Sequence, residues 1–367
     1  MTLKRILIVS SEFPPQPGGI GHHACNLAKQ FSKIGYVVHV IADERSTDGA
    51  AERHFDKSLG YPVHRIPIKK WRFFMYVHRL IILLKHVGKS DVILASGKFS
   101  LWSVAFTSLF YKRRYIAIIH GTEVNFKMSL LKYSIDQALA RFSKIIAVSQ
   151  FTKSLVVARH QHKISVIPNG YDALKWGKPL PIATALLGSP KLITVGHVSQ
   201  RKGQGHVIKQ LPKLMQVYPD IHYHCVGIPT EQALLEQLAK DLGVQTHVSF
   251  HGQVSDSVLE SMLRHSDVFV MLSGTTHTGD VEGFGIAIIE ANALGLPAIG
   301  AEGSGVEEAI ANYESGILIP HEDSEAFTKA IQYILEHRDR FQIQAKSWSE
   351  KHTWDVIIKR YIAVFES

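Results

Sequence analysis

The sequence LKRILIVSSEFPPQPGGIGHHACNLAKQFSKIGYVVHVIAD (residues 3–43) sets the fold class. Within it, residues 3–10 and 36–42 each hold a continuous apolar run of strand length, and residues 22–34 predict a helix that ends at Gly35. Strands that are apolar on both faces and joined by a helix are typical of a parallel sheet covered on both sides. The stretch therefore predicts a strand–helix–strand unit of an α/β protein.

The same alternation of apolar runs and helical segments continues along the chain in two series. Further strands are expected at 91–95, 115–119, 144–148, 164–167, 192–195, 221–226, 247–250, 268–271, 297–300 and 316–319. Between the two series, residues 171–190 are punctuated by proline and glycine and lack the pattern. We predict two parallel-sheet domains, over 1–175 and 190–354, and a helix within 355–367 that packs back on the first.

The composition fits a globular protein of two domains. The 367 residues are 46% hydrophobic and 20% charged, which excludes a disordered or collagen-like chain. Cys25 and Cys225 lie far apart and form no CxxC pair, as expected in a reducing compartment. No signal peptide is apparent, and no uncharged apolar run reaches the roughly 20 residues that a spanning helix needs. We therefore expect a cytoplasmic protein.

Charge is divided unevenly along the chain. Residues 1–175 hold 26 Lys and Arg against 10 Asp and Glu, a net charge of +16, whereas the remainder holds 15 against 22, a net charge of −7. A basic half can bind nucleic acid, anionic lipid or a phosphorylated substrate. No nucleic-acid motif accompanies it. Residues 69–85 mix bases with aromatic and aliphatic residues, which predicts either a peripheral helix on the anionic inner face of the plasma membrane or a core helix with solvated bases.

The glycine-rich loop admits more than one interpretation. The segment from Gly19 to Ala24 satisfies the dinucleotide fingerprint, and Asp43 ends the second strand where a ribose-binding acid would lie. In that fingerprint the glycines follow the strand directly, but here residues 11–17, with three prolines, intervene. Three interpretations stay open. The first choice is a loop whose backbone N–H groups bind an anion, the second is a plain turn, and the third is a true NAD site.

The strongest functional signal is the segment DVEGFGIAIIEANALGLP (residues 280–297). Glu282 and Glu290 flank the start of an apolar helix that ends at Gly295. The backbone amides of Gly285 and Ile286 form the N-terminus of this helix, where the helix dipole favours a phosphate. Carboxylates on either side can accept hydrogen bonds from sugar hydroxyls. The pattern predicts a site for a sugar phosphate or a nucleotide sugar.

With these motifs, the chain resembles the retaining glycosyltransferases of family 4, whose GT-B fold has two Rossmann-like parallel-sheet domains facing across a cleft. The mark of that family is Glu-x7-Glu, present here in EGFGIAIIE (282–290). The resemblance extends nearly end to end, through EFPPQPGGIG (12–21), IIHGTE (118–123), IIAVSQFTK (145–153), VIPNGYD (166–172), VGHVSQRKG (195–203), FHGQV (250–254) and GLPAIG (295–300). Among subgroups, the chain looks most like bacterial mannosyltransferases that modify phosphatidylinositol mannosides.

The resemblance implies a role for each matching residue. Gly18 and Gly19 would approach the donor diphosphate, and Lys202 would neutralise it together with the amides of Phe284, Gly285 and Ile286. Glu290 would bind the nucleoside ribose and Glu282 the hydroxyls of the donor sugar. The segment of Val254 would border the base, and His120 would contact the donor sugar near its anomeric centre. The expected catalytic residues are His120, Lys202 and Glu282.

One position departs from the family pattern. The family usually has an arginine five residues before the lysine, and this chain has His197 there. Histidine is partly neutral at pH 7, whereas arginine is always charged and can bind a phosphate through two hydrogen bonds. Arg201 could compensate. If protonated His197 binds the diphosphate, donor affinity should fall as the pH rises above neutral.

The resemblance also implies the reaction. In front-face transfer the acceptor hydroxyl attacks from the side on which the diphosphate leaves, and the β-phosphate can take its proton. The family needs no metal ion and the chain has no Asp-x-Asp motif, so neither a metal nor a cofactor is expected. The pair His222 and His224 has a spacing that suits a metal, but 21 histidines make chance pairs common.

We therefore expect an enzyme that moves a hexose from a nucleotide sugar to a hydroxyl acceptor and retains the anomeric configuration. The second domain would bind the donor, with GDP-mannose as first choice and UDP-hexoses as second. The first domain would bind the acceptor, which could be a lipid-linked saccharide of the cell envelope, a polysaccharide or a small metabolite. A nucleotide-sugar epimerase, an NAD-dependent oxidoreductase and a non-catalytic nucleotide-sugar binder stay open as alternatives.

Overall fold

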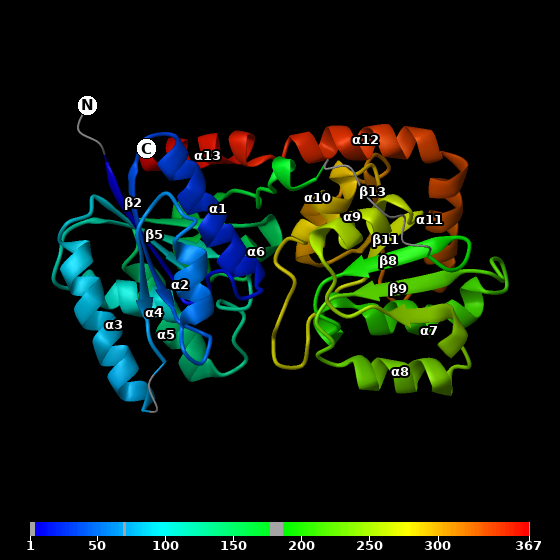
Figure 1. Ribbon diagram of the computed structural model, residues 1–367, viewed down its shortest axis with the longest axis horizontal. Coiled ribbons are helices and arrows are strands. Elements are labelled where there is room, and N and C mark those ends of the chain that lie inside the picture. The colour runs from blue at the N-terminus through cyan, green and yellow to red at the C-terminus, as the bar shows by residue number, and fades with distance from the viewer. Residues whose placement is uncertain (1–3, 69–70, 177–185, 367) are drawn as a thin grey trace. The chain divides into compact units, whose positions relative to one another are not determined.

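The computed structural model of the protein describes residues 4–68, 71–176 and 186–366. The chain divides into two compact units, and Figure 1 labels their helices and strands. The first unit comprises Met1–Gly170 and Trp354–Ser367, and the second comprises Tyr171–Thr353. Each unit is built around its own parallel sheet.

The boundary between the units lies slightly before the expected connecting segment. Tyr171 already belongs to the second unit, because its N–H donates to the carbonyl of His352 (2.9 Å) and its backbone pairs with Thr353. The short helix η2 (Ala173–Lys175) follows within the same unit. Residues 177–185 of the expected linker lie outside the described residues.

The sheet of the first unit has seven parallel strands in the order β3-β2-β1-β4-β5-β6-β7. They are β1 (Arg5–Ser10), β2 (Val37–Asp43), β3 (Val63–Ile66), β4 (Val92–Ser96), β5 (Arg114–Ile119), β6 (Lys144–Ala147) and β7 (Ile164–Val166). The apolar runs predict every one of these except β3. Strand β3 reads VHRI and lies at the edge of the sheet, where a single neighbouring strand suffices and no continuous apolar run is needed.

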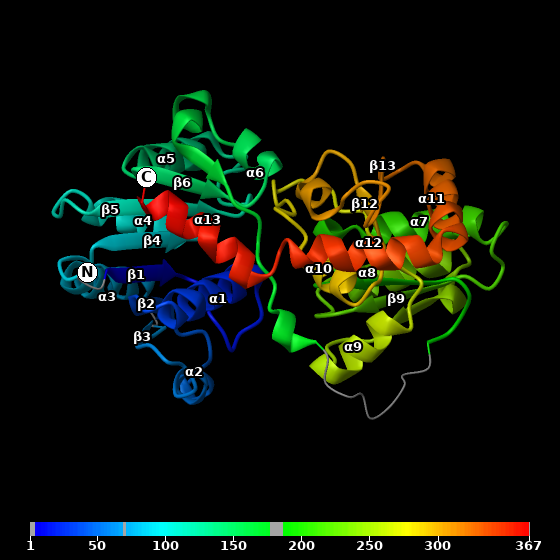
Figure 2. The same cartoon turned by 90° about the horizontal axis from the view of Figure 1, so that it is seen from above.

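Alternate residues of β1 face two different helical layers. Ile6 and Ile8 belong to the core under α1 and α13, whereas Leu7 and Val9 belong to the core under α3, α4 and α5. Figure 2 shows α1 and α13 on the same face of this sheet. The helices are α1 (Gly19–Lys33), α2 (Ala50–Asp56), α3 (Arg72–Val87), α4 (Lys98–Thr107), α5 (Ser129–Ala140), α6 (Gln150–Ser154), η1 (Ala158–Lys163) and α13 (Trp354–Glu366).

Helix α13 is the last element of the chain and is packed into the first unit. Its Trp354, Tyr361 and Phe365 side chains are buried, and Phe365 stacks on Phe31 of α1. The guanidinium of Arg114, at the start of β5, donates to the carbonyls of Val364 (2.8 Å) and Phe365 (2.6 Å). These contacts place a cation at the C-terminal end of the helix, where the helix dipole favours positive charge.

The second unit contains six parallel strands in the order β10-β9-β8-β11-β12-β13. They are β8 (Lys191–Val195), β9 (His222–Val226), β10 (Val248–Phe250), β11 (Val268–Met271), β12 (Ala298–Ala301) and β13 (Gly316–Ile319), each within one residue of an expected strand. The helices are η3 (Gln200–Lys202), α7 (Gln204–Leu214), α8 (Gln232–Asp241), η4 (Gln245–His247), α9 (Asp256–Arg264), α10 (Ile286–Ala293), η5 (Gly305–Ala309), α11 (Ser324–Glu336) and α12 (Arg338–Glu350).

In both sheets the direction of strand addition reverses at the first strand. Strand β1 lies between β2 and β4, and β8 lies between β9 and β11. Open parallel sheets bind ligands outside the carboxyl ends of their strands at such a point of reversal. Each unit therefore has one edge where a ligand site is expected, and the loops after β1, β4, β8 and β11 form these edges.

Candidate functional site

At the carboxyl edge of the second sheet, the segment after β8 makes a sharp turn at Gly203. Gly203 has a φ of +79°, and a Cβ atom at this position would lie 1.9 Å from the carbonyl oxygen of Leu272, which follows β11. Only glycine permits this approach. The turn that carries Arg201 and Lys202 is thereby held against the carboxyl end of β11.

Three charged side chains meet at this turn. Lys202 Nζ lies 2.9 Å from Glu282 Oε2, and Arg201 forms an ion pair with the same oxygen. Burial acts to raise the pKa of Glu282, but the two cations outweigh burial and hold that pKa at about 2. Glu282 is therefore ionised at neutral pH, and its single negative charge is shared by buried Lys202 and half-buried Arg201, which leaves the cluster with a net positive charge.

A second glycine, Gly305, holds the loop that carries Glu282 through a backbone hydrogen bond. The N–H of Gly305 donates to the carbonyl of Glu282 (3.1 Å), and a Cβ atom on Gly305 would lie 2.3 Å from that carbonyl oxygen. In front, the Gly285 N–H donates a hydrogen bond to the Glu282 carboxylate, and Gly285 caps α10 with a φ of +88°. The predicted Phe284 and Ile286 flank this cap, so their amides lie at the same helix N-terminus as the charged cluster.

Glu290 lies in the second turn of α10 and has a partner that the sequence does not reveal. Lys175 Nζ lies 3.7 Å from Glu290 Oε1 and 3.3 Å from Asp256 Oδ1. Burial raises the pKa of Glu290, and the positive charge of Lys175 opposes that shift. The half-buried Val254 lies two residues before Asp256 in the β10–α9 loop. The predicted base-binding segment and the predicted ribose acid are therefore linked through a lysine of η2.

His197 lies beside the charged turn but is not itself charged at neutral pH. Its Nδ1 lies 3.3 Å from the hydroxyl of Thr230. Burial, followed by the nearby charges of Arg201 and Lys202, lowers the pKa of His197 below its usual value. The lowered pKa means that the imidazole is mostly neutral at pH 7, so any dependence of donor binding on protonated His197 is expected on the acidic side of neutral.

The glycine loop of the first unit packs tightly against the start of α1. A Cβ atom on Gly21 would lie 2.8 Å from the backbone nitrogen of Phe13, and one on Gly18 would lie 2.6 Å from Glu12 Oε2. A Cβ atom on Gly19 would meet nothing within 4 Å, and no side chain caps this end of α1. Space and backbone N–H groups are therefore available at Gly19, as an anion-binding loop requires.

Asp43 has a structural role in the first unit. Its two carboxylate oxygens lie 2.6 and 2.5 Å from Nη2 of Arg79, a buried residue of α3. A ribose-binding acid must be free to accept hydrogen bonds from sugar hydroxyls. The acid of the supposed dinucleotide fingerprint is thus already bound to an arginine, and the structure gives the NAD interpretation no support.

His120 belongs to a hydrogen-bonded group at the carboxyl edge of the first sheet. His120 Nε2 and the Ser96 hydroxyl, at the end of β4, are 2.9 Å apart. The ring of His23 contacts that of His120 edge to face at 5.1 Å, and His23 Nε2 lies 3.0 Å from the Tyr361 hydroxyl. Burial lowers the pKa of His120 to about 4. His120 is therefore neutral at pH 7 and available as a hydrogen-bonding group.

Glu123 supports the same turn; it ends the motif IIHGTE (118–123), but the sequence indicates no role for it. Its Oε1 accepts a hydrogen bond from the backbone N–H of His120 (2.7 Å), while its Oε2 is buried and has no hydrogen-bond partner among the described residues. Burial raises the pKa of Glu123 to about 7. This carboxyl group is thus part of the scaffold that orients His120.

The histidines of β9 are committed to hydrogen bonds within the second unit. His222 Nε2 lies 2.8 Å from the Ser249 hydroxyl, and His224 contacts His251 through Nδ1 (3.0 Å) and the carbonyl of Leu187 through Nε2 (3.1 Å). Since these ring nitrogens already have partners, the pair is a structural feature of the sheet.

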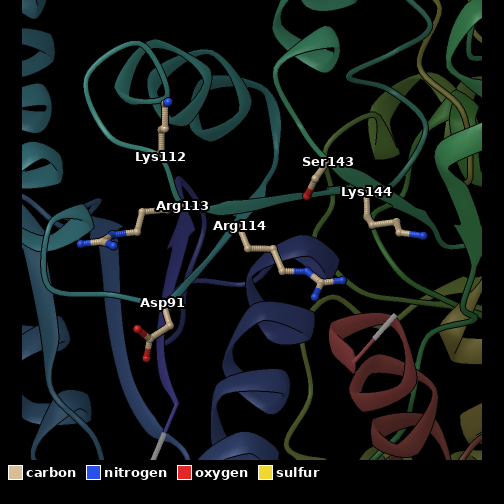
Figure 3. A pocket seen from close by; sticks show the side chains of 6 residues that line it. All are labelled: Asp91, Lys112, Arg113, Arg114, Ser143 and Lys144. Atoms are coloured by element: carbon tan, nitrogen blue, oxygen red, sulfur yellow. The ribbon is translucent and has the colours of Figure 1, made fainter.

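A hollow of about 530 Å³ lies at the opposite edge of the first sheet, at the amino ends of β4, β5 and β6. Its lining residues are Asp91, Lys112, Arg113, Arg114, Ser143 and Lys144. Arg113 donates to the carbonyl of Gly88 (2.7 Å), and Arg114 is occupied by the end of α13. Figure 3 shows the basic side chains pointing in different directions. The hollow therefore lacks the convergent polar groups of a binding site.

Comparisons with known proteins place the chain in a family. Residues 17–173 match the family described as Glycosyltransferase Family 4, and residues 183–352 match Glycosyl transferases group 1. A GDP-mannose-dependent alpha-(1-6)-phosphatidylinositol monomannoside mannosyltransferase of Mycobacterium tuberculosis is 26% identical, with 92% of this chain and 91% of that protein covered. A phosphatidyl-myo-inositol mannosyltransferase of Mycolicibacterium smegmatis is also 26% identical, with 96% and 90% covered.

Solved structures share the fold. The crystal structure of HepE of Anabaena with UDP and glucose has a TM-score of 0.78 at 20% identity and covers 98% of each chain. Sucrose-phosphate synthase of Thermosynechococcus elongatus has the same TM-score at 16% identity, with 99% of this chain and 98% of that chain covered. These likenesses confirm the predicted GT-B fold of two Rossmann-like domains. The two family matches, which together span most of the chain, show that it belongs to the glycosyltransferases of family 4.

Proposed function

We propose that the protein is a retaining hexosyltransferase that uses a nucleotide sugar as donor, with GDP-mannose favoured. The acceptor is a hydroxyl group of a cell-envelope glycolipid or polysaccharide. The observation that carries the proposal is the cluster of Arg201, Lys202 and Glu282 at the N-terminus of α10. Two cations and a set of helix-terminal amides, held in place before any ligand binds, are what a leaving diphosphate requires.

In this proposal the Glu282 carboxylate pairs with Arg201 and Lys202 until the donor diphosphate binds there. The diphosphate carries more negative charge than one carboxylate, so it replaces Glu282 as the partner of Arg201 and Lys202. Glu282 is then free to accept hydrogen bonds from hydroxyls of the donor sugar. The low pKa of Glu282 keeps the carboxylate ionised, and therefore an acceptor of hydrogen bonds, through this exchange.

Catalysis is then mainly electrostatic. Lys202, Arg201 and the amides at Gly285 stabilise the charge that develops on the diphosphate, and no metal ion is needed at that position. The acceptor hydroxyl attacks from the leaving-group side and passes its proton to the β-phosphate. His120, which is neutral, contacts the donor sugar as a hydrogen-bond partner and not as an acid.

The donor proposal follows the relatives named above. Two of them are mannosyltransferases of phosphatidylinositol lipids, and one of these is described as GDP-mannose-dependent. A UDP-hexose is the second candidate, because a solved structure with the same fold holds UDP and glucose. An epimerase or a non-catalytic binder would share the donor site but would not move the sugar to an acceptor.

A thermal-shift panel of GDP, UDP, ADP and their sugars tests the proposal. We expect GDP and GDP-mannose to raise the melting temperature by about 5 °C or more at a hundred times the dissociation constant. Transfer assays with the stabilising sugar then separate a transferase from an epimerase, which turns over donor without acceptor. Absence of a shift with every nucleotide would overturn the proposal.

We further propose that the protein works as a peripheral protein at the inner face of the plasma membrane. The described part of the chain contains no helix that is long and apolar enough to span a bilayer. Instead, adjacent helices α3, α4 and α5 expose large apolar side chains, which we call the apolar helical face: Phe73, Phe74, Val77, Ile81, Phe99, Phe106, Leu130 and Tyr133.

The apolar helical face fits a membrane surface better than a solvated one. Its α3 part falls within the expected interfacial segment, of which residues 69–70 lie outside the described residues. Lys127, just before α5, and Lys132, between Leu130 and Tyr133, are also exposed. Exposed apolar side chains with lysines beside them are typical of proteins that bind anionic bilayers.

Vesicle flotation tests this surface. We expect the protein to float with anionic vesicles at low salt and the double variant Phe73→Ser/Phe74→Ser to lose most of that binding. Ile343→Ser is the matched control, because Ile343 is 70% exposed but lies on α12 of the second unit. Equal flotation of all three proteins would contradict the proposed surface.

A further inference from the structure

Two histidines and a glutamate of the second unit come together at the start of α7, four residues beyond Lys202. His206 lies on the first turn of α7, and His321 and Glu322 follow β13. One ligand atom from each of the three lies within 4.8 Å of the others. The rings of His206 and His321 meet edge to face, with centroids 4.5 Å apart.

The positions of the two histidines are fixed by a buried amide. Gln210, 4% exposed, donates from Nε2 to the carbonyl of His321 (2.9 Å) and to that of His206 (3.2 Å). This side chain ties one turn of α7 to the segment between β13 and α11. Both imidazoles are therefore presented from a fixed backbone.

The ring nitrogens of this pair are free, in contrast to those of the β9 histidines. Among the described residues, no hydrogen bond engages either ring of His206 and His321, and His321 Nε2 lies 3.8 Å from Glu322 Oε1. Glu322 is 78% exposed at its side chain and His321 is 40% exposed, so an ion can enter from solvent.

We propose that His206, His321 and Glu322 form a binding site for a divalent transition-metal ion of the zinc class. Two imidazoles and one carboxylate form a three-ligand set that Zn²⁺ accepts, with a fourth position left for water. Ligand atoms around tetrahedral zinc lie about 3.4 Å apart for bonds of about 2.1 Å, so a rotation of the side chains closes the site. Mg²⁺ and Ca²⁺ prefer oxygen ligands and are excluded by the two imidazoles.

The site shares no residue with the proposed donor site, for which no metal is proposed. Its occupancy would clamp α7 to the segment after β13. A ligand that binds only the folded chain raises its melting temperature with concentration, so the clamp has a readout that does not depend on glycosyl transfer.

Zinc titration of the tag-free full-length protein against a chromophoric chelator tests the proposal. We expect one zinc ion per chain, at least tenfold weaker binding in His206→Gln and His321→Gln, and no displacement by excess Mg²⁺. The control is His277→Gln, which removes an exposed histidine of the same unit and should bind as the unaltered protein does. Equal binding by all four proteins, or an equal loss in His277→Gln, would overturn the site.

Glu322→Gln provides a second test that does not disturb folding, because this side chain is largely exposed. Titration with Co²⁺ should give the strong visible absorption of a four-coordinate site in the unaltered protein and a weaker or shifted band in Glu322→Gln. A spectrum that is identical in the two proteins would show that Glu322 is not a ligand and would contradict the proposed ligand set.

Discussion

The two units share a sheet topology but differ in the chemistry at their carboxyl edges. In the first unit, His120 is neutral and hydrogen-bonded to Ser96. In the second unit, Arg201, Lys202 and Glu282 form a charged cluster. The net charges show the opposite order: residues 1–175, which hold the neutral site, carry +16, and the remainder, which holds the charged cluster, carries −7. The net charge of a domain therefore does not predict the charge of its site, because surface lysines and arginines dominate the count.

The largest effect is expected from the cation of the second unit. Lys202→Met should lower kcat/KM for transfer by about 100- to 1,000-fold, because it removes a charge that stabilises the leaving diphosphate. Lys209→Met, an exposed lysine of the following helix, is the control and should leave the rate unchanged. A rate loss below tenfold in Lys202→Met would contradict the proposal that the charged cluster of the second unit stabilises the leaving group.

Glu282→Gln separates the two roles proposed for this carboxylate. Transfer should fall by about 100-fold, because the hydrogen bonds to the donor sugar weaken. Binding of the nucleoside diphosphate without sugar should strengthen, because the competitor for Arg201 and Lys202 loses its charge. Calorimetric titration with GDP and a transfer assay measure the two effects. Weaker GDP binding in the variant would contradict the exchange of partners.

The buried Glu123 of the first unit should make the stability of the protein depend on pH. Its folded-state pKa of about 7 lies above its usual value of 4.5, so it contributes stability that is complete below pH 4.5 and lost as the pH rises through 7. Glu123→Gln removes this dependence, and the variant should gain about 3 kcal/mol relative to the unaltered protein between pH 4.5 and 8. Thermal melts at both pH values measure the gain, with the exposed Glu336→Gln as control. A difference that is constant with pH would contradict the role assigned to this group.

The smallest effect is expected at the partner of Glu290. Lys175 Nζ lies 3.7 Å from Glu290 and closer to Asp256, so its ion pair with Glu290 is weak and its removal should strengthen GDP binding by about threefold. Pyrophosphate, which has no ribose, should bind Lys175→Met and the unaltered protein equally. If GDP instead binds the variant more weakly, Lys175 is a donor ligand and not a competitor of the ribose.

The sequence predicts the strands well because a buried parallel sheet needs continuous apolar runs. Strand β3 is the exception, since an edge strand such as VHRI can be partly polar. The N-terminus of α10 could likewise be foreseen, because helix-start signals are local. Fold class and the placement of Glu282 and Lys202 in one unit thus follow from nearby residues.

Partners of the site residues could not be foreseen, because they come from distant segments. Lys175 reaches Glu290 across more than a hundred residues, and Tyr361 reaches His23 from the other end of the chain. Asp43 fits a ribose-binding pattern by position alone, and only the structure reveals that Arg79 occupies it. Local sequence patterns predict which side chains lie at the carboxyl edge of a sheet. The charge state of those side chains depends on contacts that only the tertiary fold creates.

Helix α13 has a consequence for how the protein is made. The ribosome completes all seven strands of the first unit's sheet before it begins the second unit, yet Trp354, Tyr361 and Phe365 of the first unit are made only after the second unit. Until then, the apolar surface of α1 around Phe31 stays uncovered. The first unit therefore stays incomplete until α13 has been made, and a chain that stops after the entire second unit but before α13 would be prone to aggregate.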